Sequence, residues 1–253
     1  MTALEPLRRE LDLWAENNEV ATLWWRDDDA DSSTDEIRRM LDLSGESGAT
    51  VVVAVVPATA CDALAPVLLD CPGAVAVQHG YAHKDHSPAD VRGKWELGMH
   101  RPLETILHEL GSGWIRLTDL FGNRVRPMLV PPWNRIDPAV VRELPGMGYS
   151  TLSTFEPRSA PEAAPGLRRV NCHCDIIAWK RDRTFIGAAS MVERLLEHLR
   201  ARRQGDADAD EPTGLLTHVW ANDEEAWSAL GEVLALVAEH PGGRWLDRTG
   251  LGL

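Results

Sequence analysis

The sequence is short of positive charge. It contains 26 lysine and arginine residues against 39 aspartate and glutamate residues, which gives a formal net charge of -13 and a pI of about 5.1. A protein that binds nucleic acid through its phosphates needs a basic surface. The balance therefore argues against a general nucleic-acid binder, and it leaves a neutral sugar, a peptide or a metal ion as possible ligands.

The sequence also lacks a long apolar run. Its first twenty residues, MTALEPLRRELDLWAENNEV, carry charges throughout and contain no apolar core of a signal peptide. No other stretch is long and apolar enough to span a membrane. We therefore expect no membrane span and a cytoplasmic location. A hydrophobic fraction of 44% and a charged fraction of 26% are typical of a globular protein.

Cysteine is scarce as well. The four cysteines are Cys61, Cys71, Cys172 and Cys174, and in a chain without an export signal we expect reduced thiols. The tripeptide Cys172-His173-Cys174 has no second Cys/His pair at the spacing of a zinc finger. We therefore expect a structural or local role for it.

Apolar runs alternate with amphipathic stretches along the chain. β-Branched runs such as TVVVAVV at 50–56 are typical of parallel strands covered on both faces. There is no internal repeat, and the acidic stretch 205–212 is expected to be a flexible loop. The alternation predicts an α/β fold with a parallel sheet, open or closed into a barrel, in one domain over residues 1–253. The expected strands are 21–25, 50–56, 74–77, 126–130, 149–154 and 215–218. The expected helices are 4–15, 34–43, 58–69, 102–120, 138–144, 191–203 and 224–240.

Residues that can carry chemistry follow four of these strands. They are the stretches 26–29 (RDDD), 79–83 (HGYAH), 131–135 (PPWNR) and 217–218 (TH). Parallel α/β proteins build their sites at the carboxyl ends of strands. Four such stretches at one edge of a sheet are therefore a stronger signal than any one of them alone.

Two of the stretches suggest a metal site. Three consecutive aspartates repel one another, and a divalent cation would relieve that repulsion, although a solvated loop or a helix N-cap would also use aspartate. His79 and His83 are four residues apart, so on one helical turn both rings would face the same way. Two imidazoles and one carboxylate form a common zinc triad. His86 would be either a partner that orients a ligand or a surface residue.

The other two stretches suggest an acyl-transfer site. The prolines before Trp133 stiffen the chain, and a rigid loop can present a backbone N–H to an oxyanion; a plain proline turn is the alternative. His218 could act as a general acid with a pKa near neutrality. An isolated histidine at a strand end is more often structural.

These motifs resemble those of the polysaccharide deacetylases of carbohydrate esterase family 4, the NodB-like proteins. The family motif TFDDG is similar to RDDDA at 26–30, and H-S/T-x-x-H is similar to HGYAH at 79–83. The motif R-P-P-Y-G is similar to VPPWN at 130–134, and L-x-H is similar to 216–218. An aspartate and a tryptophan of a further motif match Asp175 and Trp179. The five motifs occur in order over residues 20–220, which is the expected motif-bearing core.

The resemblance implies a distorted (β/α) barrel of about seven parallel strands and one divalent metal ion, with zinc first and cobalt or nickel as alternatives. It implies the metal ligands Asp29, His79 and His83. It implies the catalytic residues Asp28 as base, His218 as acid, Trp133 as oxyanion donor and Asp175 as a tuning residue. The substrate-binding candidates are Tyr81, Trp133, Asn134 and Arg135. Trp24, Trp25 and Trp95 could also stack on a sugar, although core packing is favoured for Trp24 and Trp25.

The sequence departs from the family pattern in four places. Ala30 replaces a glycine, and Gly80 replaces a serine or threonine. Val130 stands where the family has an arginine, which Arg135 or Arg126 could replace. The aspartate triplet also leaves the register open, so Asp27 could take the role of Asp28 or Asp29.

The expected function is a metal-dependent hydrolase that removes an N-acetyl or O-acetyl group from a carbohydrate or glycoconjugate. Without an export signal, a nucleotide- or lipid-linked sugar precursor is favoured over a finished cell-wall polymer. Two alternatives remain open: a hydrolase of a linear or cyclic amide that is not a sugar, and an inactive sugar-binding protein of the same fold.

Overall fold

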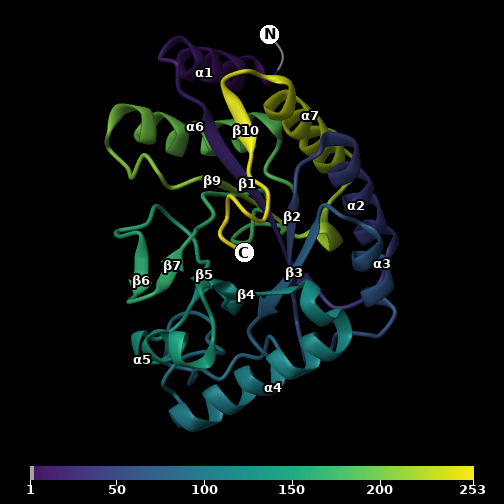
Figure 1. Ribbon diagram of the computed structural model, residues 1–253, viewed down its shortest axis with the longest axis vertical. Coiled ribbons are helices and arrows are strands. Elements are labelled where there is room, and N and C mark those ends of the chain that lie inside the picture. The colour runs from purple at the N-terminus through teal and green to yellow at the C-terminus, as the bar shows by residue number, and fades with distance from the viewer. Residues whose placement is uncertain (1–2) are drawn as a thin grey trace.

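The computed structural model describes residues 3–253. It contains one ten-stranded sheet in which the strands run in the order β6-β7-β5-β4-β3-β2-β1-β9-β8, with β10 paired to the start of β1. All neighbouring strands are parallel except β6 and β7. Helices surround this central sheet (Figure 1). The predicted α/β fold with a mostly parallel sheet is confirmed.

The strands are longest at the centre of the sheet. Within residues 3–253 no pairing joins β6 to β8, the two ends of the strand order, so the sheet is open. An isolated bridge between Phe155 and Cys172 only continues the pairing of β5 with β7. The strands are β1 (Ala21–Ala30), β2 (Val51–Val55), β3 (Ala74–His79), β4 (Val125–Val130), β5 (Thr151–Leu152), β6 (Glu162–Ala164), β7 (Leu167–Arg169), β8 (Cys174–Asp175), β9 (Thr213–Thr217) and β10 (Gly243–Trp245). The sequence did not predict β6, β7, β8 or β10, each of which has only two or three residues.

Three of the seven α-helices within residues 3–253 begin at a capping side chain. Thr34, Asp137 and Asp223 accept hydrogen bonds from the first turns of their helices, as N-caps do. The α-helices are α1 (Glu5–Glu16), α2 (Asp35–Ser47), α3 (Leu64–Asp70), α4 (Leu103–Phe121), α5 (Pro138–Glu143), α6 (Ala188–Gln204) and α7 (Glu224–Glu239). The expected helix at 58–69 begins late, since turns occupy its first residues. None of the helices among residues 3–253 combines the length and hydrophobicity needed to cross a bilayer.

The two faces of β1 pack against different parts of the core. Trp25 belongs to the large cluster between sheet and helices, whereas Trp24 packs with Val52, Val77 and Met128 on the other face of the sheet. Both tryptophans are fully buried, so the core role favoured for them is confirmed. Alternation along β1 continues past these tryptophans, and it decides how the following polar residues point.

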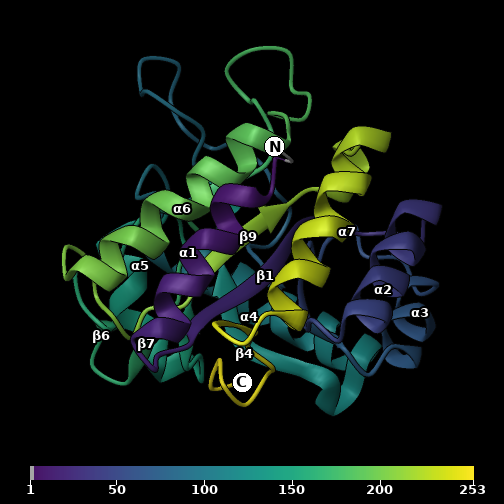
Figure 2. The same ribbon diagram turned by 90° about the horizontal axis from the view of Figure 1, so that it is seen from above.

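Two long loops project from one end of the molecule. They are the connection from β3 to α4, residues 80–102, and the connection from β8 to α6, residues 176–187. Figure 2 shows both standing clear of the helices. Both leave the carboxyl ends of strands, which is the edge where the sequence predicts the site.

Candidate active site

The three aspartates, expected after the strand, lie within β1 and have three different environments. Asp27 points to the helix-covered face, where its carboxylate accepts a hydrogen bond of 2.6 Å from Thr217 Oγ1. Burial raises the pKa of Asp27 well above its usual range. Asp28 points to the opposite face, as the period of two requires. Pairing with β2 shifts register after Asp27, and Asp29 has a left-handed φ of 71°, so this bulge turns Asp29 to the same cavity as Asp28.

Asp29, His79 and His83 form a compact ligand group. Asp29 Oδ1 lies 3.1 Å from Nε2 of each histidine. His79 Nδ1 lies 3.0 Å from the Val130 carbonyl, so that nitrogen donates its proton, and in the neutral form of the ring the lone pair is on Nε2. Two ligand atoms on a tetrahedral zinc ion are separated by about 3.3 Å, from bond lengths of about 2.0–2.1 Å. The donor set, its spacing and the histidine tautomer therefore fit a divalent ion.

The charges of this group depend on its partners. Burial would raise the pKa of Asp29, but the hydrogen bond and positive charge of His79, with His218 and His83, bring it far below the usual range. Burial would lower the pKa of His79, but Asp28 and the Asp29 hydrogen bond raise it. Burial and the neighbouring His79 lower the pKa of His83. The Asp29 carboxylate is thus ionised and the His83 ring neutral, the states that bind a metal.

The expected helical turn between His79 and His83 is not present. His79 ends β3, and the chain then turns through Gly80 and His83, which have φ values of 53° and 52°. A Cβ atom on Gly80 would collide with the Glu96 carboxylate and the Pro132 ring. Glycine is therefore required here, which explains the departure from serine or threonine.

Glu96 organises this turn from within. Its side chain is fully buried, and its carboxylate accepts hydrogen bonds from the backbone N–H groups of Tyr81, Ala82 and Lys84 at 3.0, 2.7 and 3.3 Å. Sequence reasoning missed Glu96, since it lies far along the loop. His86 lies outside the ligand group and outside the cavity lining.

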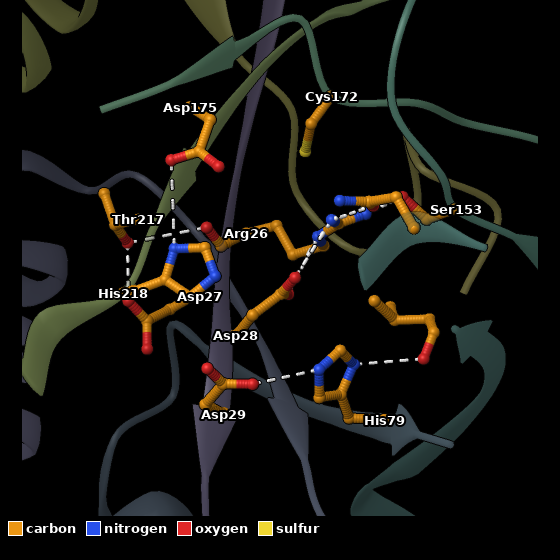
Figure 3. A network of polar contacts seen from close by, with 12 residues as sticks. Arg26, Asp27, Asp28, Asp29, His79, Ser153, Cys172, Asp175, Thr217 and His218 are labelled. Carbon is orange, nitrogen blue, oxygen red and sulfur yellow. Dashed lines mark hydrogen bonds and ion pairs between the residues drawn. The ribbon is translucent and has the colours of Figure 1, made fainter. Parts of the chain in front are cut away.

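Asp28 is held by Arg26, two residues earlier on the same face of β1. Arg26 Nε lies 2.9 Å from Asp28 Oδ1, and Arg26 Nη2 donates to Asp28 Oδ2 at 3.0 Å. The guanidinium also donates to Ser153 Oγ at 2.6 Å and to Asn134 Oδ1 at 2.7 Å. Burial would lower the pKa of Arg26, but Asp28 raises it, so the arginine stays charged. Figure 3 shows this pair beside Asp29 and His79.

Arg135 and Arg126, the two candidates for the arginine missing at Val130, do not contact Asp28. Arg135 donates to the Lys94 carbonyl at 3.3 Å, and Arg126 donates to the Asn123 carbonyl at 2.6 Å. Neither forms an ion pair within residues 3–253. Whether Arg135 or Arg126 replaces the missing motif-three arginine stays open. Neither of them holds Asp28, because Arg26 already occupies both carboxylate oxygens.

His218 and Asp175 face each other across the ends of β9 and β8. His218 Nδ1 lies 3.9 Å from Asp175 Oδ1, and Asp175 Oδ2 accepts a hydrogen bond of 2.7 Å from the Trp179 indole. Burial raises the pKa of Asp175, and His218 partly offsets this effect. The Trp179 ring packs edge-on against His218, with centroids 4.7 Å apart. These contacts orient the His218 imidazole and leave it at the wall of the cavity.

These residues share one cavity of about 620 Å³. Of the four substrate-binding candidates, Trp133, Asn134 and Arg135 line it, whereas Tyr81 does not. Trp95 lines only a neighbouring cavity. The predicted site residues that line it are Asp28, Asp29, His79, His83, Trp133, Asn134, Arg135, Asp175 and His218. The sequence missed Lys94, Arg183 and Trp220, which also line it.

Trp133 has an unusual backbone. Its φ of 55° and ψ of 20° lie in the left-handed region, which a bulky residue rarely adopts. Within residues 3–253 its backbone N–H donates no hydrogen bond. Its ring packs on His83, with centroids 4.4 Å apart. The strained turn thus leaves a free donor beside the ligand group.

A second histidine cluster lies away from this cavity. His173 and His198 each place Nε2 3.5 Å from Glu211 Oε2, and all three residues are buried. The Gly214 N–H donates to His173 Nδ1 at 2.9 Å, so the neutral ring has its proton on Nε2 and offers no lone pair to a metal there. The two rings are also stacked, 3.4 Å apart, so their lone pairs do not converge. This cluster fits a hydrogen-bonded structural role.

The acidic stretch 205–212, expected to be a flexible loop, is held to the rest of the fold by contacts of Glu211 and Asp208 with Arg158. Glu211 is fully buried and accepts a hydrogen bond of 2.8 Å from the Arg158 N–H, and the Arg158 side chain pairs with Asp208.

Burial raises the pKa of the Cys172 thiol to about 12 and keeps it protonated. The local role expected for the 172–174 tripeptide agrees with these contacts.

Protein-family models and curated protein sequences give no match to this chain. Solved structures do. A Mycobacterium smegmatis protein assigned as a polysaccharide deacetylase is 16% identical, with a TM-score of 0.68 over 92% of this chain and 88% of its own. A family 4 carbohydrate esterase from Streptomyces lividans, solved with acetate, is 13% identical, with a TM-score of 0.56 over 86% and 88%.

The chain has the polysaccharide deacetylase fold. The predicted resemblance to carbohydrate esterase family 4 is thereby confirmed at the level of the fold. This deacetylase fold also includes a pseudoenzyme from Bacillus anthracis, which is 11% identical, with a TM-score of 0.57 over 89% of this chain and 63% of its own. The fold alone therefore does not decide between an enzyme and an inactive relative.

Proposed function

We propose that this protein is a metal-dependent hydrolase that removes an N-acetyl or O-acetyl group from a carbohydrate. One observation carries the proposal. The ligand group of Asp29, His79 and His83 opens into the same cavity as a carboxylate, Asp28, and an imidazole, His218. Hydrolysis of an amide needs a base for water, a donor for the oxyanion and an acid for the leaving amine.

Asp29, His79 and His83 would hold one divalent ion, with zinc first and cobalt or nickel as alternatives. Two imidazoles and one carboxylate leave a coordination position open, as in catalytic zinc sites. When bound, such an ion polarises an acyl carbonyl and makes a water molecule more acidic.

The remaining steps belong to residues of the chain. The Asp28 carboxylate, oriented by Arg26, would accept a proton from the water that attacks the acyl carbon. The Trp133 N–H would donate to the oxygen on which negative charge develops. His218, oriented by Asp175, would give a proton to the leaving nitrogen. Water adds across the C–N bond, so the products are acetate and a free amino sugar.

The first test measures metal content and acetate release together. Purified protein is reconstituted with zinc, and elemental analysis is compared with a His79→Ala/His83→Ala variant. We expect about one ion at this site in the wild type and its loss in the variant. A His100→Ala/His108→Ala variant, which removes two exposed histidines outside the cavity, is the matched control and should keep the ion.

Acetate release from N-acetylated chitooligosaccharides then tests the chemistry. Asp28→Asn should bind zinc like the wild type and lose activity. Zinc binding without acetate release in the wild type would instead favour an inactive sugar-binding protein. Equal metal content in the wild type and in His79→Ala/His83→Ala would refute the proposed site.

A further inference from the structure

The surroundings of the active-site cavity differ in charge from the rest of the protein. A second cavity of about 700 Å³ adjoins the first and shares Trp133, Asn134, Arg135, Asp175 and Trp179 with it. Six basic side chains line the two cavities, which we call the basic rim: Lys94, Arg135, Lys180, Arg181, Arg183 and Arg194. A concentration of positive charge at one site is unexpected in a chain with a net charge of -13.

The carboxylates near the basic rim mostly have other partners. Asp182 lies near Arg181 and Asp85 near Lys94, and they accept hydrogen bonds from Thr184 and Ser87. Asp28 pairs with Arg26, Asp29 contacts two histidines, and Asp175 accepts from the Trp179 indole. Among the residues lining the two cavities, only one other carboxylate, that of Glu156, is present. Within residues 3–253, no side chain of the basic rim forms an ion pair. The positive charge is therefore available to a ligand.

The two projecting loops bring this charge to the mouth of the site. Lys94 comes from loop 80–102 and Arg183 from loop 176–187, the loops that stand clear of the fold in Figure 2. Lys94 Nζ lies 5.6 Å from the centre of the Trp133 ring, and Arg135 donates to the Lys94 carbonyl. Three members of the basic rim thus line the cavity that holds the ligand group.

The same mouth offers aromatic surface for a sugar ring. Trp179 is 38% exposed and Trp220 is 53% exposed, and their rings lie 5.9 Å apart beside His218. Arginine and lysine side chains without carboxylate partners are suited to phosphate and carboxylate groups, and charge of one sign at a cavity mouth concentrates ligands of the other sign.

We infer that the substrate is an acylated amino sugar that also carries a phosphate or carboxylate group, bound by Lys94, Arg135 and Arg183. This inference rests on the proposed function, because it names the substrate class of the same site. The acyl group would point to Asp28 and His218, while the anionic group would remain at the mouth.

Calorimetric binding of three sugars tests the inference. N-acetylglucosamine is neutral, N-acetylglucosamine 1-phosphate carries a phosphate, and N-acetylmuramic acid carries a carboxylate. We expect at least one anionic sugar to bind about tenfold more tightly than the neutral one, from the sum of three exposed charge contacts. Added salt should reduce this preference. The anionic sugar that binds more tightly identifies the group.

Two variants and an ion-free sample complete the design. Lys94→Gln/Arg183→Gln should lose the preference and keep its affinity for the neutral sugar. Lys84→Gln, in the same loop but outside both cavity linings, should keep the preference. The preference should also remain in ion-free protein, which excludes direct binding of phosphate to the metal.

The inference and the proposed function fail in different ways. Equal binding of neutral and anionic sugars, no binding of any sugar, or a preference that survives in Lys94→Gln/Arg183→Gln would overturn the inference. Preferential binding of an anionic sugar without acetate release would overturn the proposed hydrolase and leave the basic rim as a binding site. Hydrolysis of neutral and anionic substrates with the same kcat/KM would overturn the inference and support the proposed hydrolase.

Discussion

Replacing Arg26 by methionine should test the ion pair on which the site depends. Arg26 is fully buried, and Asp28 is 3% exposed. The substitution keeps an unbranched side chain but removes the only cation that contacts both Asp28 oxygens in the described chain. Ser153 and Asn134 would lose a partner as well.

The expected magnitude follows from burial. Removing one partner of a buried ion pair costs about 3–5 kcal/mol, because the other charge remains in a poorly solvated place. For a chain of this size that corresponds to a fall in Tm of roughly 10 °C. If Asp28→Asn is added, the uncompensated charge disappears, so the double variant should be more stable than the sum of the two single effects predicts.

Thermal and urea unfolding of the four proteins measure this coupling. The exposed pair Arg39–Glu224 provides the control, since its N···O distance is 2.6 Å but its side chains are largely in solvent. Arg39→Met should change Tm little. The reasoning is refuted if Arg26→Met is as stable as Arg39→Met, or if the effects of Arg26→Met and Asp28→Asn simply add.

Three further predictions follow from single residues. Burial lowers the pKa of His173 from 6.5 to about 4, so the unfolded state binds the proton more readily, and stability should fall as the pH falls through this range. The expected loss is about 2 kcal/mol between roughly pH 7 and pH 5; denaturant unfolding should show a weaker pH dependence in His173→Asn. Gly80→Ala should destabilise by about 1–3 kcal/mol and lower zinc content, whereas Gly111→Ala, in open space on α4, should be neutral or stabilising; opposite results would contradict the strain argument. Asp175→Asn should lower kcat more than it changes KM, because His218 loses its orienting charge; an unchanged kcat would remove Asp175 from the mechanism.

Local sequence signals predicted much of the fold. The apolar run of β2 and the helical stretches of α2 and α5 needed only neighbouring residues, so the expected ranges 50–56, 34–43 and 138–144 lie close to the observed elements. The strands of two or three residues, such as β7 and β8, have no such signal. β8 pairs with the longer β9, whereas β7 pairs with two other short strands, β5 and β6, so both depend on chain segments distant in sequence.

The site likewise contains some residues that local sequence signals could predict and others that they could not. Alternation along β1 places Arg26 and Asp28 on one face, so the period of two could have revealed this pair from sequence. The family pattern instead places an arginine in the third motif, where Val130 stands in this chain. Glu96 had no comparable signal, since its three hydrogen-bond partners are 12 to 15 residues away.

The sequence by itself determined the alternation of strands and helices and the order of the polar motifs, because both depend on the chemistry of adjacent residues. Only the tertiary structure decided which aspartate meets the histidines, which arginine holds Asp28, and that Lys94 and Arg183 share one cavity mouth. A bulge, a left-handed turn and two long loops determine where these residues lie. Their geometry depends on contacts between strands that are far apart in the chain.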